Sequence, residues 1–329
     1  MQPCELDANV GYHKQRWVVS YRTLPNAAYD TYKLTATYYK VTEGLTSTLM
    51  LNNKGAAAIN ANLTLYSMDG SVFHPAPIIV PAASYIDVDM HQIIAGADPK
   101  FSEGSMKISY QGGNLQLGAQ VKMVDSDHGL IWAEQLVYTT KFVSSRLENV
   151  WWFPYENSDT SVVVSNTSAG TVVVTMAVDG TSPSQSAPTQ ITLAPWETRV
   201  LDIVEDIAGR HNGHVHSTGG ISITHTGAPG AVLARMFVSR ADKGYSAAMN
   251  FVDPEATASS HWNGSGLRFK NVDGSDLGPS LVARNNGNAT SHVTGRIIYT
   301  DAANNVQTIS IPQFTLSGGE TKLINSIHW

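Results

Sequence analysis

The chain has 329 residues, of which 42% are hydrophobic and only 15% are charged, and its formal net charge is −6. The hydrophobic fraction can build cores, which excludes a wholly disordered chain, and the negative charge excludes the basic surface that nucleic-acid binding needs. No apolar stretch approaches the roughly 18 residues of a membrane span, and a single cysteine, Cys4, excludes an intrachain disulfide or a cysteine-based zinc site.

The first forty residues stand apart from the rest of the chain. Residues 1–10 lack the basic and apolar regions of a secretory signal, while residues 16–22 (RWVVSYR) and 30–36 (DTYKLTA) have the alternation of strands. We therefore predict an N-terminal extension, residues 1–40, with one or two strands. Such a start fits an intracellular protein, a processed protein or a piece of a longer chain, and the many Thr/Val strands with few charges favour the last.

An internal repeat organises the remainder. Three segments of the same pattern, each followed by a polar turn and a second strand, are STLMLNN (47–53), TSVVVSN (160–166) and PSLVARN (279–285). The second strand closes in each copy on a turn that carries an aspartate: Asp69, Asp179 and Asp301. Asp-Gly, present in the first two, is a strong hairpin signal because glycine accepts a positive φ.

The later parts of the repeat occur in only two copies. Each has a short helical turn, which ends at Gly96 and Gly209, and then three more strands. Short alternating strands bounded by frequent turns predict an all-β fold of tandem antiparallel β-sandwiches, Ig-like or fibronectin-like. A propeller is the alternative, but a repeat of about 115 residues is too long for one blade.

Aromatic strands at 38–41, 151–155 and 267–269 open the three copies. They place β-sandwich repeat 1 at residues 41–145, repeat 2 at 146–257 and an incomplete repeat 3 at 258–329. The short linkers before the second and third copies predict stacked units with limited freedom.

The third copy lacks counterparts of three strands. Three explanations are open: a fragment cut from a longer array, a smaller variant that covers its core another way, or complementation, in which the N-terminal strands complete the open half-domain of another subunit. The last would allow self-assembly through the third repeat.

Motifs for chemistry are sparse. Three histidines, His211, His214 and His216, could offer imidazoles to a metal, but the corresponding loop of the first copy has none, so an exposed polar loop is the simpler interpretation. Asp125 and Asp127 suggest a Ca²⁺ site or, more simply, a hairpin turn. Hydrolase, zinc-protease, phosphate-loop and dinucleotide motifs are absent from the sequence, so we expect no catalytic residue and no cofactor.

An aromatic patch is the remaining candidate site. Trp151, Trp152 and Tyr155 could stack on sugar rings, although strand alternation must bury part of this patch.

The motifs at residues 47–53, 66–70, 104–110 and 191–195 resemble those of bacterial secreted or surface-exposed proteins built from tandem Ig-like modules. The resemblance implies a stalk, adhesin, matrix component or accessory module of a carbohydrate-active protein. We therefore expect a non-enzymatic, extracellular or cell-surface structural protein whose partners are other protein subunits or surface polysaccharide. The alternatives are a carbohydrate-binding module and, after it, a metal-dependent enzyme that uses the histidine loop.

Overall fold

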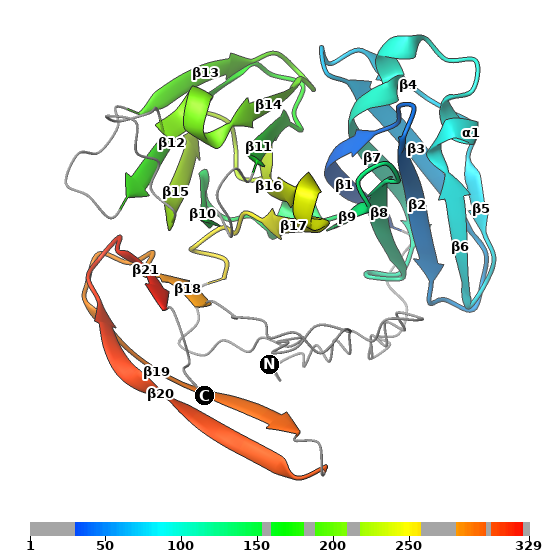
Figure 1. The fold of residues 1–329 in the computed structure, drawn as a ribbon. Coiled ribbons are helices and arrows are strands. Elements are labelled where there is room, and N and C mark those ends of the chain that lie inside the picture. The colour runs from blue at the N-terminus through cyan, green and yellow to red at the C-terminus, as the bar shows by residue number, and fades with distance from the viewer. Residues whose placement is uncertain are drawn as a thin grey trace.

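The computed structural model describes residues 30–152, 159–180, 188–208, 218–257, 281–300 and 304–324 (Figure 1). Small antiparallel sheets make up most of this part of the chain, which confirms the all-β prediction. We call residues 30–138 unit 1, residues 146–253 unit 2 and residues 281–324 the third segment.

Unit 1 has two sheets around one core. The first runs in the order β1 (Asp30–Lys40), β7 (Glu103–Gly112), β3 (Ile59–Ser67) and β4 (Val72–Phe73), with β5 (Ile78–Val80) also on β3. The second runs in the order β6 (Ser84–Asp89), β2 (Leu45–Asn53), β8 (Leu117–Asp125) and β9 (Leu130–Gln135). Alternate apolar residues of both sheets, such as Leu34 and Leu49, are buried together in a single cluster.

Strand β1 corrects the predicted boundary of this unit. Residues 30–36 were expected in an N-terminal extension, but β1 pairs with β7 along its length and Leu34 lies opposite Ile108. The strand belongs to unit 1 because its alternate apolar side chains complete that core. Residues 16–22 lie outside the described residues.

Unit 2 repeats the arrangement. One sheet has the order β10 (Arg146–Trp152), β15 (Thr218–His225), β12 (Val172–Gly180), β13 (Thr189–Leu193). The other has the order β14 (Thr198–Asp202), β11 (Asp159–Asn166), β16 (Val232–Arg240), β17 (Tyr245–Asn250). Both again contribute to one buried cluster.

The third segment contains two separate strand pairs. Strand β18 (Leu281–Arg284) pairs with β21 (Thr321–Ile324), and β19 (Ser291–Thr300) pairs with β20 (Val306–Leu316) in a long hairpin (Figure 1). These correspond to β11, β14, β12 and β13 of unit 2.

Helical turns are few and short in the described part. They are α1 (Met90–Ile94), the 3-10 turns η1 (Pro99–Ser102), η2 (Thr139–Lys141) and η4 (Ala241–Lys243), and the π turn η3 (Ile203–Ala208). The turns predicted near Gly96 and Gly209 are thus present as α1 and η3. Asp89 caps α1 by accepting a hydrogen bond from the His91 N–H, at 2.9 Å.

A buried asparagine holds the same turn in all three copies. The Asn166 Nδ2 donates to the carbonyls of Gly170, Leu193 and Ala194. Asn53 and Asn285 each donate to three carbonyls in the same way, and all three side chains accept an N–H from two residues ahead. The repeated asparagine therefore joins the hairpin loop to the returning strand in each copy.

Candidate functional site: the junctions between units

An aromatic contact joins unit 1 to unit 2. The Trp196 ring stacks on the Tyr66 ring with centroids 4.7 Å apart and an angle of 13° between the planes. The Lys107 Nζ lies 4.7 Å from the Trp196 ring centroid, which adds a cation–π contact. Trp196 holds a positive φ of 64°, which is uncommon for a residue with a side chain. The strained backbone conformation of Trp196 therefore occurs at the residue whose ring makes the contact between the units.

Gly70 lets the two units approach closely at this point. Its φ is 83°, and a Cβ there would lie 2.3 Å from the Pro195 carbonyl oxygen of unit 2. The Asp-Gly turn predicted from the sequence thus closes a hairpin and also touches the next unit.

Buried charges cross the same junction. The Glu134 carboxylate of unit 1 is 2% exposed and accepts hydrogen bonds from the backbone N–H groups of Thr37, at 2.6 Å, and Tyr38, at 3.2 Å. Burial raises the pKa of Glu134, and the positive charge of Arg235 opposes that rise only in part. Arg235 extends from β16 of unit 2 and donates to the Ala133 carbonyl of unit 1. Arg235 therefore finds one partner across the junction, whereas the hydrogen-bond partners of Glu134 lie in its own unit.

Further hydrogen bonds, from serine hydroxyls and from the backbone, extend the junction on either side. The Ser165 Oγ donates to the Thr37 carbonyl at 2.7 Å, and the Thr198 N–H donates to the Met68 carbonyl at 3.1 Å. At the other end, the Ser246 Oγ accepts from the Ile131 N–H and donates to the Ile131 carbonyl. The two units therefore form a continuous, hydrogen-bonded interface.

A second junction joins unit 2 to the third segment. The Arg284 Nε donates to the Glu148 Oε2 at 2.9 Å, and Arg146 binds the other oxygen of the same carboxylate. The Glu148 side chain is fully buried and the Arg284 side chain is 5% exposed. Gly220 provides the space, since a Cβ there would lie 1.7 Å from the Arg284 Nη1.

Both junctions use equivalent positions. Ser165 lies opposite Thr198 on paired strands of unit 2, and Arg284 lies opposite Thr321 on the corresponding strands of the third segment. In each case the side chain binds both its cross-strand threonine and the preceding unit. The opening strand of the preceding unit provides the contact, β1 for β11 and β10 for β18. The mode of contact between units is therefore repeated.

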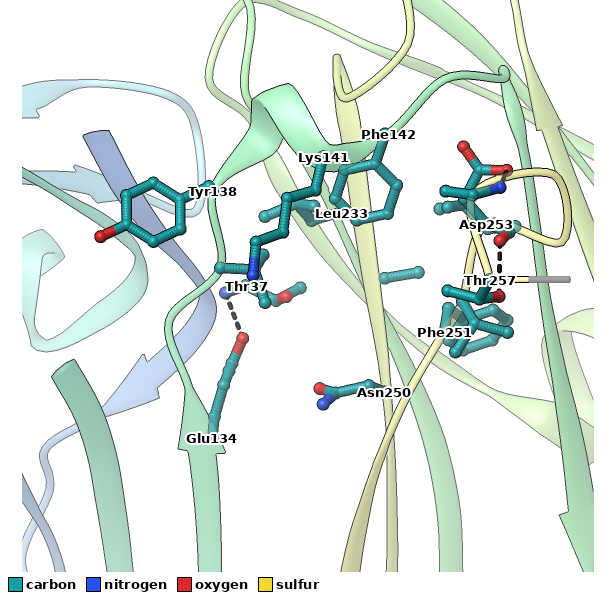
Figure 2. Close-up of a pocket in the computed structure, with 15 residues that line it drawn as sticks. Thr37, Glu134, Tyr138, Lys141, Phe142, Leu233, Asn250, Phe251, Asp253 and Thr257 are labelled. Carbon is teal, nitrogen blue, oxygen red and sulfur yellow. Dashed lines mark hydrogen bonds between the residues drawn. The ribbon is translucent and has the colours of Figure 1, made fainter. Parts of the chain in front are cut away.

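A cavity of about 210 Å³ lies beside the first junction (Figure 2). It is lined mainly by apolar groups of both units, including Val137, Leu233 and Phe251. Two carboxylates line the cavity, and both accept hydrogen bonds from the protein. Those of Glu134 are described above, and Asp253 accepts from the backbone N–H groups of Val143 and Ser144 at 2.7 and 2.8 Å. Burial alone would raise the pKa of Asp253, but these hydrogen bonds outweigh it and lower the pKa to about 2. Asp253 thus holds the linker between the units, and Glu134 holds the backbone of β1.

The predicted glycan patch is only partly described. Trp151 is 2% exposed and packs in the core of unit 2, so its ring does not offer a stacking surface. Alternation along β10 explains this burial, because Leu147 on the same face is buried as well. The side chain of Trp152 and all of Tyr155 lie outside the described residues.

Of the two candidate metal sites, the structure describes only the one at Asp125 and Asp127. His211, His214 and His216 lie outside the described residues, and no group of three or more potential ligands occurs among those the structure describes. The Asp125 carboxylate accepts the N–H groups of Asp127 and His128, as a turn-forming aspartate does. Asp125 therefore fits the hairpin-turn interpretation.

The junction residues Trp196, Glu134 and Arg235 were not predicted from the sequence. In the described part of the chain, no helix is long and apolar enough to cross a membrane. No family model, curated protein or solved structure matches the chain.

Proposed function

We propose that this chain is a non-enzymatic structural or interaction protein, a rigid rod of tandem Ig-like β-sandwiches that links or displays partners outside the cell. The observation that carries the proposal is the repeated junction, in which equivalent strands join unit 1 to unit 2 and unit 2 to the third segment. A contact that repeats head to tail gives each unit a fixed place relative to its neighbours.

Small antiparallel sheets can be arranged as stacked sandwiches or as the blades of a propeller. We favour sandwiches because each complete unit buries one core between its own two sheets. Propeller blades, in contrast, are single sheets arranged around a common channel.

A rigid spacer also needs a junction that resists bending. Flexible tethers make few contacts, whereas the first junction combines stacked rings, a buried arginine that donates across it, and hydrogen bonds to backbone carbonyls. The position of unit 2 is thereby fixed by contacts on several strands of unit 1.

The test is the distribution of distances across the first junction. Spin labels at Asn62→Cys and Gln190→Cys, in a Cys4→Ser background, occupy exposed positions in the two units. We expect one narrow distribution, and a broader one when Trp196→Ala is added. A broad distribution in the parent protein would contradict the proposal, since it would mean that the units are flexibly tethered.

A further inference from the structure

The second junction depends on two features of unit 2. One is the buried carboxylate of Glu148, to which the Arg284 Nε donates at 2.9 Å. The other is the absence of a side chain at Gly220, where a Cβ would lie 1.7 Å from the Arg284 Nη1. An arginine is therefore accommodated here because unit 2 provides both a charge and a gap.

Unit 1 has neither feature at the equivalent positions. Thr35 takes the place of Glu148, because each follows the buried leucine of its opening strand and makes the isolated bridge to the end of its unit. Ser105 takes the place of Gly220, because each stands three residues before the isoleucine that lies opposite that leucine. Thr35 is 5% exposed and Ser105 is 3% exposed. An arginine docked on unit 1 would thus meet a neutral side chain in place of the carboxylate and a buried serine in place of the gap.

The first junction differs from the second in the same way. It depends on the Trp196 ring, which stacks on Tyr66 and lies 4.7 Å from the Lys107 Nζ. The third segment has Gly319 at the position of Trp196, with a positive φ in both, and the strand register puts Asp179 of unit 2 at the position of Tyr66. The aromatic pair therefore cannot form at the second junction.

We propose that these residues specify the order of the units. The end of unit 2 accepts a following unit that carries arginine at the position of Arg284, whereas the end of unit 1 accepts one that carries serine there and tryptophan in the turn. A wrongly docked unit would bury an arginine without its carboxylate or leave Glu148 with Arg146 alone, so the mismatched junctions are penalised. Misassembly is a characteristic failure of repeat proteins, which gives such discrimination a use. The inference rests on the proposed rod and adds the rule that orders its units.

The experiment exchanges the two sets of residues at the second junction of the full chain. The third segment carries either the native arginine or Arg284→Ser, and unit 2 is either unchanged or carries Glu148→Thr/Gly220→Ser, which are the residues of unit 1. We expect the amides of β18 and β21 to exchange within about tenfold of each other in the two matched combinations. In the two mismatched combinations they should exchange faster by about a hundredfold or more, since each leaves a buried charge without its partner. The amides of β2 and β8 in unit 1 are the internal control.

A pair of single variants repeats the test at the first junction. Ser165→Arg brings a guanidinium to the end of unit 1, whereas Ser165→Ala removes only the hydroxyl that donates to the Thr37 carbonyl. We expect Ser165→Arg to broaden the distance distribution between the spin labels of the two units, and Ser165→Ala to leave it narrow.

Three results would overturn the inference. They are a narrow distribution in Ser165→Arg, mismatched combinations that stay as well protected as the parent protein, or a matched serine combination that is protected no better than the mismatched ones. Failure of that matched combination to fold counts as the third result. A broad distribution in the parent protein would instead contradict the proposed rod, so the two failures can be told apart.

Discussion

The two junctions share their geometry and differ in their chemistry. At the first, Ser165 makes a neutral hydrogen bond to Thr37, and stacked rings and buried charges lie around it. At the second, Arg284 occupies the position equivalent to Ser165 and binds a fully buried glutamate, Glu148. The comparison teaches that the strands set how units meet, while a few side chains set how strongly they are held.

The largest effect should come from Arg284→Ala. Removal of one partner leaves the Glu148 charge buried with Arg146 alone, which costs about 3–5 kcal/mol for a buried pair. We expect β18 and β21 to open more readily, measured as faster amide hydrogen exchange, while unit 1 is unaffected. The double variant Glu148→Leu/Arg284→Met should recover most of the loss, because it removes both charges. Unchanged exchange in Arg284→Ala would mean that this pair does not hold the second junction.

The next effect concerns the asparagine beside each junction residue. Asn166→Ala should destabilise unit 2 by about 3 kcal/mol, because it leaves three carbonyls and the Ser168 N–H without their side-chain partner. Chemical denaturation followed by tryptophan fluorescence measures the loss. Asn285→Ala breaks the same bonds but should affect only the third segment, so equal loss in unit 2 would contradict the local role.

A smaller effect distinguishes contact from strain at Trp196. Trp196→Ala should weaken the first junction by about 2 kcal/mol, since it removes the ring that stacks on Tyr66. Trp196→Gly removes the same ring but relieves the positive φ, so it should be less damaging by about 1 kcal/mol. Hydrogen exchange at β14 and β3 measures both. If alanine is tolerated as well as glycine, backbone strain does not contribute at this turn.

Much of the fold could be predicted from the sequence because the alternation of apolar and polar residues that marks a strand lies within the strand itself. The alternation of apolar residues and the Asp69–Gly70 turn predicted the strands. The repeated segments predicted which positions are equivalent in the three copies, and Asn53, Asn166 and Asn285 make equivalent hydrogen bonds at one of them. The boundary at β1 was missed because its pairing with β7 is long-range. Leu34 lies opposite Ile108 in unit 1, and Leu147 lies opposite Ile223 at the equivalent position of unit 2. The sequence alone does not reveal that these strands pair.

The junction residues could not be predicted in the same way. Glu134 and Arg235 come from different units, so no spacing along the chain relates them. Each does carry a signal, because both are charged and directly follow an apolar run of their strand. Such a residue either faces solvent or finds a partner across an interface, and only the packing of the units decides between these.

The smallest expected effect tests whether the stability of unit 2 depends on pH through a buried histidine. His225 ends β15, opposite Val174 of β12, and it is buried. Burial lowers the pKa of His225 below its usual value, and the nearby Gly227 backbone offsets this only in part. The unfolded chain therefore takes up a proton that the folded chain does not, so this contribution to stability is present above about pH 6.5 and is lost as the pH falls below it.

His225→Phe should remove this dependence while it keeps the ring buried. We expect the parent protein to lose up to about 1 kcal/mol more than the variant between pH 7 and pH 5.5, measured by chemical denaturation at each pH. The comparison with the variant is needed because Glu134, whose pKa is raised, acts with the opposite sign: its contribution to stability grows as the pH falls. Parallel pH profiles would mean that His225 does not titrate differently in the folded chain, and the stability of unit 2 would then depend on pH only through other groups.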